Sequence, residues 1–145
     1  METKHPIPVV RAIIENSKGE ILILKRAKTD YGLDKWCLPG GKVDYMNNLM
    51  EAIALEVKEE TNLNLKEIEI MFYIDSAPKQ RGQMHCIEFY FKAKPKNIDN
   101  LKINEESSEF KWAKKEEVDE IDFAFDHGKA VERYFKERED KYKRI

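Results

Sequence analysis

Apolar residues recur along this chain in two patterns, one typical of β-strands and one typical of α-helices. Residues 8–15 are rich in β-branched side chains, and residues 20–26 form a second apolar run after a turn. We expect these two segments to pair as an antiparallel hairpin. Three more strands are expected, the second of which alternates between apolar and polar positions. They cover residues 68–75, 84–93 and 110–113.

Two segments show the apolar spacing expected of amphipathic helices. The first covers residues 49–61 and follows Asn47 and Asn48, which both suit an N-cap. Asn62 follows this helix and suits a C-cap, because asparagine tolerates the left-handed backbone conformation. The second predicted helix begins at Asp126 and ends near residue 142.

The order of strands, helix, strands and helix indicates an α+β domain, built as an α/β/α sandwich around a central mixed β-sheet. A length of 145 residues suits one domain, which we assign to residues 1–145. Hydrophobic residues make up 41% of the chain and charged residues 37%, so a core and a densely charged surface are both expected. The sequence leaves open whether the protein is a monomer or a homodimer.

Charge and cysteine content exclude several classes of protein. The formal net charge of −2 argues against a nucleic-acid-binding protein that depends on a basic surface. We find no apolar run suited to a signal peptide or to a membrane span, so no membrane partner is expected. Cys37 and Cys86 are far apart and form no CxxC pattern. We therefore expect reduced cysteines in a cytoplasmic protein.

A glycine turn followed by an acidic helix is the most informative feature of the chain. Residues 27–45 form a long irregular segment, which usually carries function in a compact domain, and it contains Gly40 and Gly41. Glu56, Glu59 and Glu60 then fall three and four positions apart, so they crowd one patch of the helix. Clustered carboxylates suit Mg²⁺, which binds oxygen ligands together with substrate phosphates. The alternative is an ordinary solvated acidic face.

The segment from Gly41 to Leu63 resembles the 23-residue box of Nudix hydrolases, G-x5-E-x7-R-E-U-x-E-E-x-G-U, where U is a bulky aliphatic residue. Leu38-Pro39-Gly40 before the box is also typical of the family. Three positions depart from the pattern: Asn47 replaces a glutamate, Leu55 an arginine and Asn62 a glycine. In the family the glutamate and the arginine are seen as supports for the loop and the metal helix. We expect Leu55 to replace that support by packing.

The resemblance implies roles for the acidic residues. Glu56 and Glu60 would hold Mg²⁺, or alternatively Mn²⁺, with Glu59 nearby and the Gly40 carbonyl as a further ligand. Many family members carry another carboxylate before the late tryptophan-bearing strand, and Glu106 is the best match, with Glu105 second. Glu59, Glu106 and a metal-bound hydroxide are the alternatives for the general base.

Contacts with substrate are expected from charged and aromatic side chains around the box. Arg26 and Lys42 suit phosphate, Trp36 and Tyr73 suit stacking on a base, and Asp126 suits a hydrogen bond to an exocyclic amine. Each has an ordinary structural alternative, such as a solvent-facing cation, a core aromatic or a helix N-cap. Further candidates are Val9, Arg11, Tyr31 and Phe125, whereas the three histidines, His5, His85 and His127, are isolated in sequence.

These features together predict a Mg²⁺-dependent pyrophosphohydrolase that cleaves the phosphoanhydride of a nucleoside diphosphate derivative. A nucleoside triphosphate is the leading small-molecule substrate, and nucleotide sugars and ADP-ribose remain open. Because the box is altered, a catalytically weakened module that binds a nucleotide or a protein is the alternative. Processing of RNA 5′ ends would require a positive channel, which the net charge does not favour.

Overall fold

The computed structural model describes residues 5–28, 32–78 and 83–143. Tyr31, one of the candidate substrate contacts, lies outside these residues. Both predicted helices and all five predicted strands are present, with two additional short strands and two 3₁₀ turns. The elements are β1 (Ile7–Ile14), β2 (Ile21–Arg26), β3 (Trp36–Cys37), β4 (Gly40–Lys42), α1 (Leu49–Thr61), β5 (Leu65–Ser76), β6 (Cys86–Pro95), η1 (Ile98–Asn100), β7 (Ser107–Ala113), η2 (Lys115–Glu120) and α2 (His127–Lys143).

The strands form two sheets, and the predicted hairpin of the first two strands is wrong. β1 lies in a four-stranded sheet of order β4-β1-β6-β5, where it is antiparallel to β4 and parallel to β6. β2 lies in a three-stranded antiparallel sheet of order β3-β2-β7. A single bridge, Glu15 to Ile21, joins the two segments across their turn. Since β1 and β2 each bury side chains on both faces, long-range packing decides their partners.

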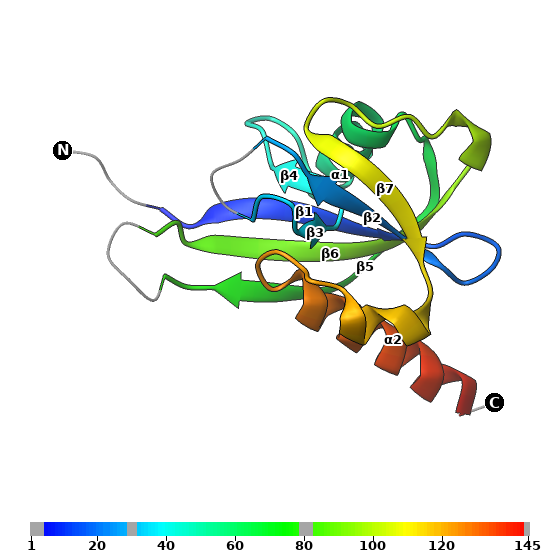
Figure 1. Ribbon diagram of the computed structural model, residues 1–145. Helices are drawn as coiled ribbons and strands as arrows, with labels where there is room; N and C mark the ends of the chain where they lie inside the picture. The colour runs from blue at the N-terminus through cyan, green and yellow to red at the C-terminus, as the bar shows by residue number, and fades with distance from the viewer. Residues whose placement is uncertain (1–4, 29–31, 79–82, 144–145) are drawn as a thin grey trace.

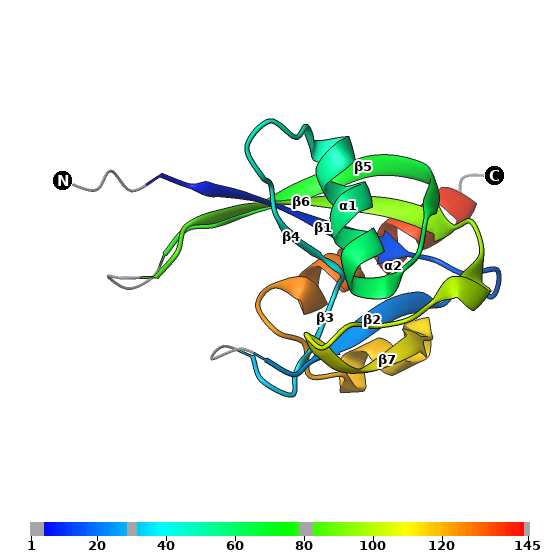
Figure 2. The ribbon, with the colours of Figure 1, turned by 90° about the horizontal axis from the view of Figure 1, so that it is seen from above.

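Two helices cover opposite faces of the large sheet (Figure 1), as expected for the predicted α+β sandwich. Alternate side chains of β1 divide between two cores. Val10, Ala12 and Ile14 pack with α1, whereas Ile13 packs with α2. β2 alternates in the same way. The view from above shows α1 lying over β1 and β6, with the β2–β7 sheet beside them (Figure 2).

Helix α1 has the predicted bounds and the predicted cap residues. The Asn48 side chain accepts a hydrogen bond from the Glu51 amide, and Asn62 adopts the left-handed conformation with φ of 61°. The helix buries Ala52, Ile53 and Val57. Leu55, however, is 49% exposed, so the prediction that it packs as an apolar support is wrong.

The irregular segment before α1 contains β3 and β4, which the sequence did not indicate. Gly40 pairs with Arg11 of β1 and has φ of 152°. A Cβ at Gly40 would lie 2.0 Å from the Val10 carbonyl oxygen, so only glycine allows this close approach. β4 thereby fixes the glycine turn against β1, directly before α1.

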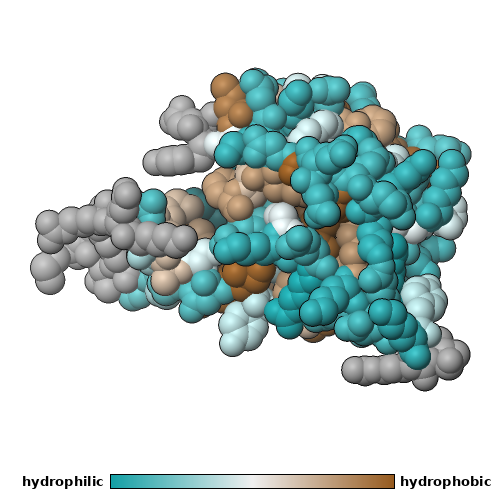
Figure 3. Space-filling model, turned by 60° about the horizontal axis from the view of Figure 1, so that its bottom comes forward, coloured by the Kyte–Doolittle hydropathy of each residue, from teal (hydrophilic) through white to brown (hydrophobic). Residues whose placement is uncertain are grey.

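The surface on the side of α2 is mainly hydrophilic, with small apolar areas between the charged side chains (Figure 3). Within the described residues, neither helix is apolar and long enough to cross a lipid bilayer.

Candidate active site

Two of the three box glutamates reach the glycine turn. The Gly40 amide donates a hydrogen bond to Oε2 of Glu60, with a distance of 3.2 Å. Glu56 lies against Gly41, where an added Cβ would be only 2.6 Å from Glu56 Oε2. A side chain at position 41 would therefore displace this carboxylate from the turn. Glu59 is exposed on the same part of α1. The predicted convergence of acidic side chains on the turn is present for Glu56 and Glu60.

The carboxylates destabilise one another's charged forms. Burial is the main cause that raises the pKa of Glu60 to about 8, although the hydrogen bond from Gly40 opposes it. Burial likewise raises the pKa of Glu56, and the charges of Glu59, Asp44 and Glu106 raise it further. The positive charge of Arg11 lowers both pKa values, but it offsets only part of the increase. The cluster therefore favours an added positive charge.

Glu106 joins this cluster from a different part of the chain. The Asn104 side chain donates to the Glu59 carbonyl at 3.2 Å, and the Ala27 amide donates to the Glu106 carbonyl at 2.9 Å. These contacts hold the loop before β7 between the end of β2 and the end of α1. Its charge raises the pKa of both Glu56 and Glu60. Asp44 belongs to the same electrostatic group, but its position in the irregular segment gave no sequence signal.

The donor set fits a hard divalent cation. It consists of carboxylate oxygens next to the backbone of Gly40 and Gly41, which is the ligand chemistry of Mg²⁺ and Mn²⁺. Burial and the charges of Glu56 and Glu106 disfavour the ionised form of Glu60, which a bound cation would stabilise. Across the described part of the chain, no three acidic, histidine or cysteine side chains are already arranged to enclose an ion. Binding would thus require side-chain adjustment within the cluster.

Three of the candidate substrate contacts lie near one another: Arg26 at the end of β2, and Phe125 and Asp126 directly before α2. The Arg26 guanidinium lies over the Phe125 ring, 4.9 Å from its centroid. Phe125 is more than half exposed and has φ of 54°, which is unusual for a bulky residue and typical of functional sites. Asp126 follows it and accepts a hydrogen bond from Ser76 Oγ at 2.9 Å. Its carbonyl also accepts from the Ala130 amide, so Asp126 lies at the start of α2.

The other three candidates are more dispersed. Trp36 is half-buried in the core beside α2, and its backbone pairs with the segment before that helix. Lys42 is exposed at the end of β4. Tyr73 is 63% exposed on β5, and its ring lies tilted against Phe89, with 6.4 Å between the ring centroids. Because β1 and β6 separate β5 from β4, strand spacing puts Tyr73 about 14 Å from the β4 strand.

A buried polar network beside the cluster was missed by sequence reasoning. Arg11 donates to Glu88 Oε2 at 3.0 Å, and His127 Nε2 lies 3.4 Å from the same oxygen. Glu88 is only 5% exposed, and His127 is fully buried. His127 and Arg11 lower the pKa of Glu88 against the effect of burial. Burial, aided by Arg11, lowers the pKa of His127 to about 4. Arg11 itself was a candidate, but its two partners were not.

The sequence signal for this network is weak. The alternation along residues 84–93 puts Glu88 on the polar side, which suggested solvent exposure. That side is covered by α2, and Tyr90 on the same side is also buried. A buried acidic residue can be recognised only when its partners, 77 residues away in the case of Arg11, are known.

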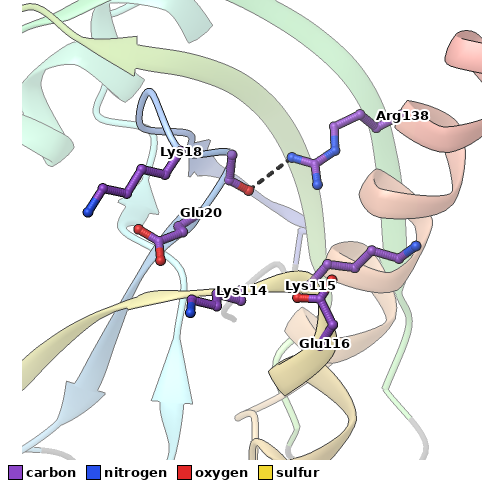
Figure 4. A pocket seen from close by; sticks show the side chains of 7 residues that line it. Lys18, Glu20, Lys114, Lys115, Glu116 and Arg138 are labelled. Carbon is purple, nitrogen blue, oxygen red and sulfur yellow. Dashed lines mark hydrogen bonds between the residues drawn. The ribbon is translucent and has the colours of Figure 1, made fainter.

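A separate pocket lies at the turn between β1 and β2 (Figure 4). Charged side chains from this turn, from η2 and from α2 surround it, and Arg138 donates to the Gly19 carbonyl at 3.0 Å. None of the predicted site residues lines it. The pocket therefore belongs to the docking of α2, which also joins Tyr134 and Arg138 to Glu15.

Comparison with known proteins identifies the family of the chain. A NUDIX domain family model matches residues 5–134. The chain is 29% identical over 134 residues to an ADP-ribose pyrophosphatase of Methanocaldococcus jannaschii, covering 91% of this chain and 75% of that protein. It is 31% identical over 120 residues to the nucleoside triphosphatase NudI of Escherichia coli O81, covering 76% and 83%. The solved MutT protein of Methanosarcina mazei Go1 has 27% identity and a TM-score of 0.78, covering 95% and 99%.

Other curated relatives are longer than this chain. The chain spans 23% of the length of one of them and 57% of the length of another. The family match nevertheless covers most of the chain, and the solved relative shares its fold along nearly the whole length. The chain therefore belongs to the NUDIX domain family of hydrolases.

Proposed function

We propose that this protein is a cytoplasmic, Mg²⁺-dependent pyrophosphohydrolase that cleaves a phosphoanhydride bond in a nucleoside diphosphate derivative. The observation that carries the proposal is the approach of Glu56 and Glu60 to the Gly40–Gly41 turn, with Glu106 added from the opposite loop. A divalent ion held there would neutralise phosphate charge and lower the pKa of a bound water. Mn²⁺ fits the same oxygen ligands.

The chain's own residues divide between metal binding and substrate binding. Glu56, Glu60 and the Gly40 carbonyl would hold the ion, with Glu59 beside them. Arg26 would meet phosphate, since it ends β2, where the amide of the next residue, Ala27, donates to the Glu106 carbonyl. In-line attack on phosphorus depends mainly on positioning and on electrostatic stabilisation. A metal ion on one side of the phosphate and Arg26 on the other would supply both.

Glu59 and Glu106 are the candidates for the general base. Both are exposed and could accept a proton from an attacking water. Separate Glu59→Gln and Glu106→Gln variants distinguish them. The base variant loses the acidic limb of the pH–rate profile, whereas a variant that only weakens metal binding regains activity at high Mg²⁺.

Recognition of the nucleoside is proposed for the surface around Phe125. Its exposed ring beside Arg26 offers a stacking face next to a positive charge. Asp126 follows Phe125 directly in the chain. The backbone of Trp36 pairs with that of Phe123 nearby, and Lys42 would contribute from β4. Tyr73 is the most distant of the proposed contacts in strand order. Nucleoside triphosphates are our leading substrates, and ADP-ribose is the second choice, because relatives named for each class match the chain.

A release assay tests the proposal. Wild type and Glu60→Gln are compared with Mg²⁺ on nucleoside triphosphates, nucleotide sugars and ADP-ribose, and the products are identified by chromatography. We expect release of phosphate or pyrophosphate, or cleavage into two nucleotides, in the wild type and loss of at least about 100-fold in the variant. Equal background in both proteins on every substrate would favour a binding module, which the altered Asn47 and Leu55 positions suggested.

A further inference from the structure

The segment that leads into the glycine turn is fixed by three other elements. The Pro39 carbonyl accepts a hydrogen bond from the Ala12 amide of β1 at 2.8 Å. The Gly40 amide donates to Glu60 of α1 at 3.2 Å. The third anchor comes from α2, nearly ninety residues later in the chain, and it is a side chain. The Leu38 amide donates to Nδ1 of His127 at 3.1 Å.

The contact with Leu38 determines the chemical state of the His127 ring. Because Nδ1 accepts a hydrogen bond from an amide, it cannot carry a proton, and a neutral ring then carries its proton on Nε2. Nε2 lies 3.4 Å from Oε2 of Glu88, a long contact. No other acceptor among the described residues replaces it. The low pKa of His127, caused mainly by burial, agrees with a neutral ring.

Both partners of the amide bond are withdrawn from water. Leu38 and His127 are each 0% exposed. A buried amide that loses its acceptor keeps the cost of its desolvation, so the segment would move to find another partner. Pro39 has no amide hydrogen, and Leu38 is therefore the only residue between Cys37 and Gly40 whose N–H can be anchored. This anchor acts together with the contacts of Pro39 and Gly40 to position the Gly40 carbonyl.

We propose that His127 is a positioning residue of the metal site, which fixes the Gly40 carbonyl and the facing Glu60 by holding the Leu38 amide. The proposal rests on the proposed function, because it concerns the same metal site. It assigns the first turn of α2 a role in metal affinity. His127 itself does not touch the ion or the substrate.

Binding of Mn²⁺ to the full chain, without substrate, tests the proposal. His127→Leu removes the acceptor, whereas His127→Asn keeps an oxygen near the position of Nδ1. We expect His127→Leu to weaken Mn²⁺ binding about 10-fold or more, the usual effect of removing an outer partner of a metal site, and His127→Asn to retain most of the affinity. Each titration is followed by calorimetry or electron paramagnetic resonance, at a temperature where all variants are folded.

Tyr134→Phe is the matched control on the same helix. It removes the hydrogen bond to Glu15, which docks the far part of α2, without touching the glycine turn. We expect it to lower the melting temperature and to leave Mn²⁺ affinity unchanged. Equal weakening by Tyr134→Phe and His127→Leu would reduce His127 to a general stabiliser of α2 and overturn the proposal. Unchanged affinity in a folded His127→Leu would overturn it as well.

A second measurement does not depend on the metal. In the metal-free wild type, ¹⁵N spectra of the imidazole should show the Nε2–H tautomer, and the Leu38 amide should exchange slowly with solvent. In His127→Asn the protection of Leu38 should persist. The Nδ1–H tautomer, or fast exchange at Leu38, would refute the proposed anchor even if His127→Leu does not fold. Absence of Mn²⁺ binding in the wild type would instead contradict the proposed function, and with it the role of the anchor in metal affinity.

Discussion

Replacing Glu60 by glutamine should stabilise the metal-free protein at alkaline pH while weakening its response to Mg²⁺. Glu60 is largely buried, and burial is the main reason that its pKa rises from 4.5 to about 8. Between these two values the folded state binds a proton that the unfolded state has released. The free energy of unfolding therefore falls as pH rises through this window, and it falls no further above about pH 8.

The magnitude follows from the two pKa values. At about 1.4 kcal/mol per pKa unit, the full change corresponds to about 5 kcal/mol. From about pH 6 upward, roughly 3 kcal/mol of this loss is still to come. Glutamine keeps a carbonyl oxygen that can accept the hydrogen bond from the Gly40 amide, but it has no charge to desolvate. The variant should lack this part of the pH dependence.

Urea unfolding in the presence of a chelator, at several values between about pH 6 and pH 9, measures the difference. Glu59→Gln is the control, since Glu59 lies on the same helix and is exposed. We expect its pH dependence to keep the part that comes from Glu60 and to differ from the wild type only through Glu56, whose pKa the Glu59 charge raises. Adding Mg²⁺ at about pH 8.5 should stabilise the wild type and Glu59→Gln more than Glu60→Gln. Parallel pH curves for the wild type and Glu60→Gln would show that Glu60 is ionised without metal and that the reasoning is wrong.

Three further predictions concern other parts of the molecule. Because the pKa of His127 is lowered from 6.5 to about 4, the unfolded state takes up a proton at a higher pH than the folded state does. The free energy of unfolding should therefore fall by roughly 3 kcal/mol as pH decreases between those two values. Urea unfolding of the wild type and of His127→Asn over this pH range isolates the loss. Glu106→Gln should reduce kcat while leaving metal-free thermal stability equal or higher, because it removes a charge that raises the pKa of Glu56 and Glu60. Leu55→Arg should change the melting temperature by less than about 3 °C, since the side chain is half exposed; a large decrease would restore the packing role.

Local signals predicted the elements well, but they did not predict how the strands pair. The bounds of α1 follow from Asn48 and Asn62, whose capping contacts lie within four residues of each. The turn after β1 has equally clear local chemistry, yet it leads to one bridge rather than a hairpin. Pairing depends on which faces are buried, and β1 buries both. A strand with two apolar faces gives no indication of its neighbours.

In the candidate site too, the residues with a local sequence signal could be predicted and the others could not. The acidic residues of α1 and the glycine turn lie within one continuous segment, so their spacing was enough to predict that they act together. Glu106 could be placed by its distance from the late strand, and the structure brings its charge to the cluster. Glu88 and His127 come from distant segments, and each looked ordinary alone. They approach each other on a face of β6 that α2 covers, and the periodicity of the sequence cannot distinguish such a buried face from a solvated one.

The departures at Asn47 and Leu55 can also be judged from the structure. The family resemblance implies that a glutamate and an arginine at these positions support the loop and the metal helix, and this chain has neither charge. Leu55 does not replace them by packing, because half of its surface is exposed. The glycine turn is instead joined to β1 through the Pro39 carbonyl and to α2 through the Leu38 amide. Since these anchors act on the turn itself, loss of the polar pair does not require loss of the proposed metal site. The anchors therefore support our proposal of an active hydrolase over a binding module.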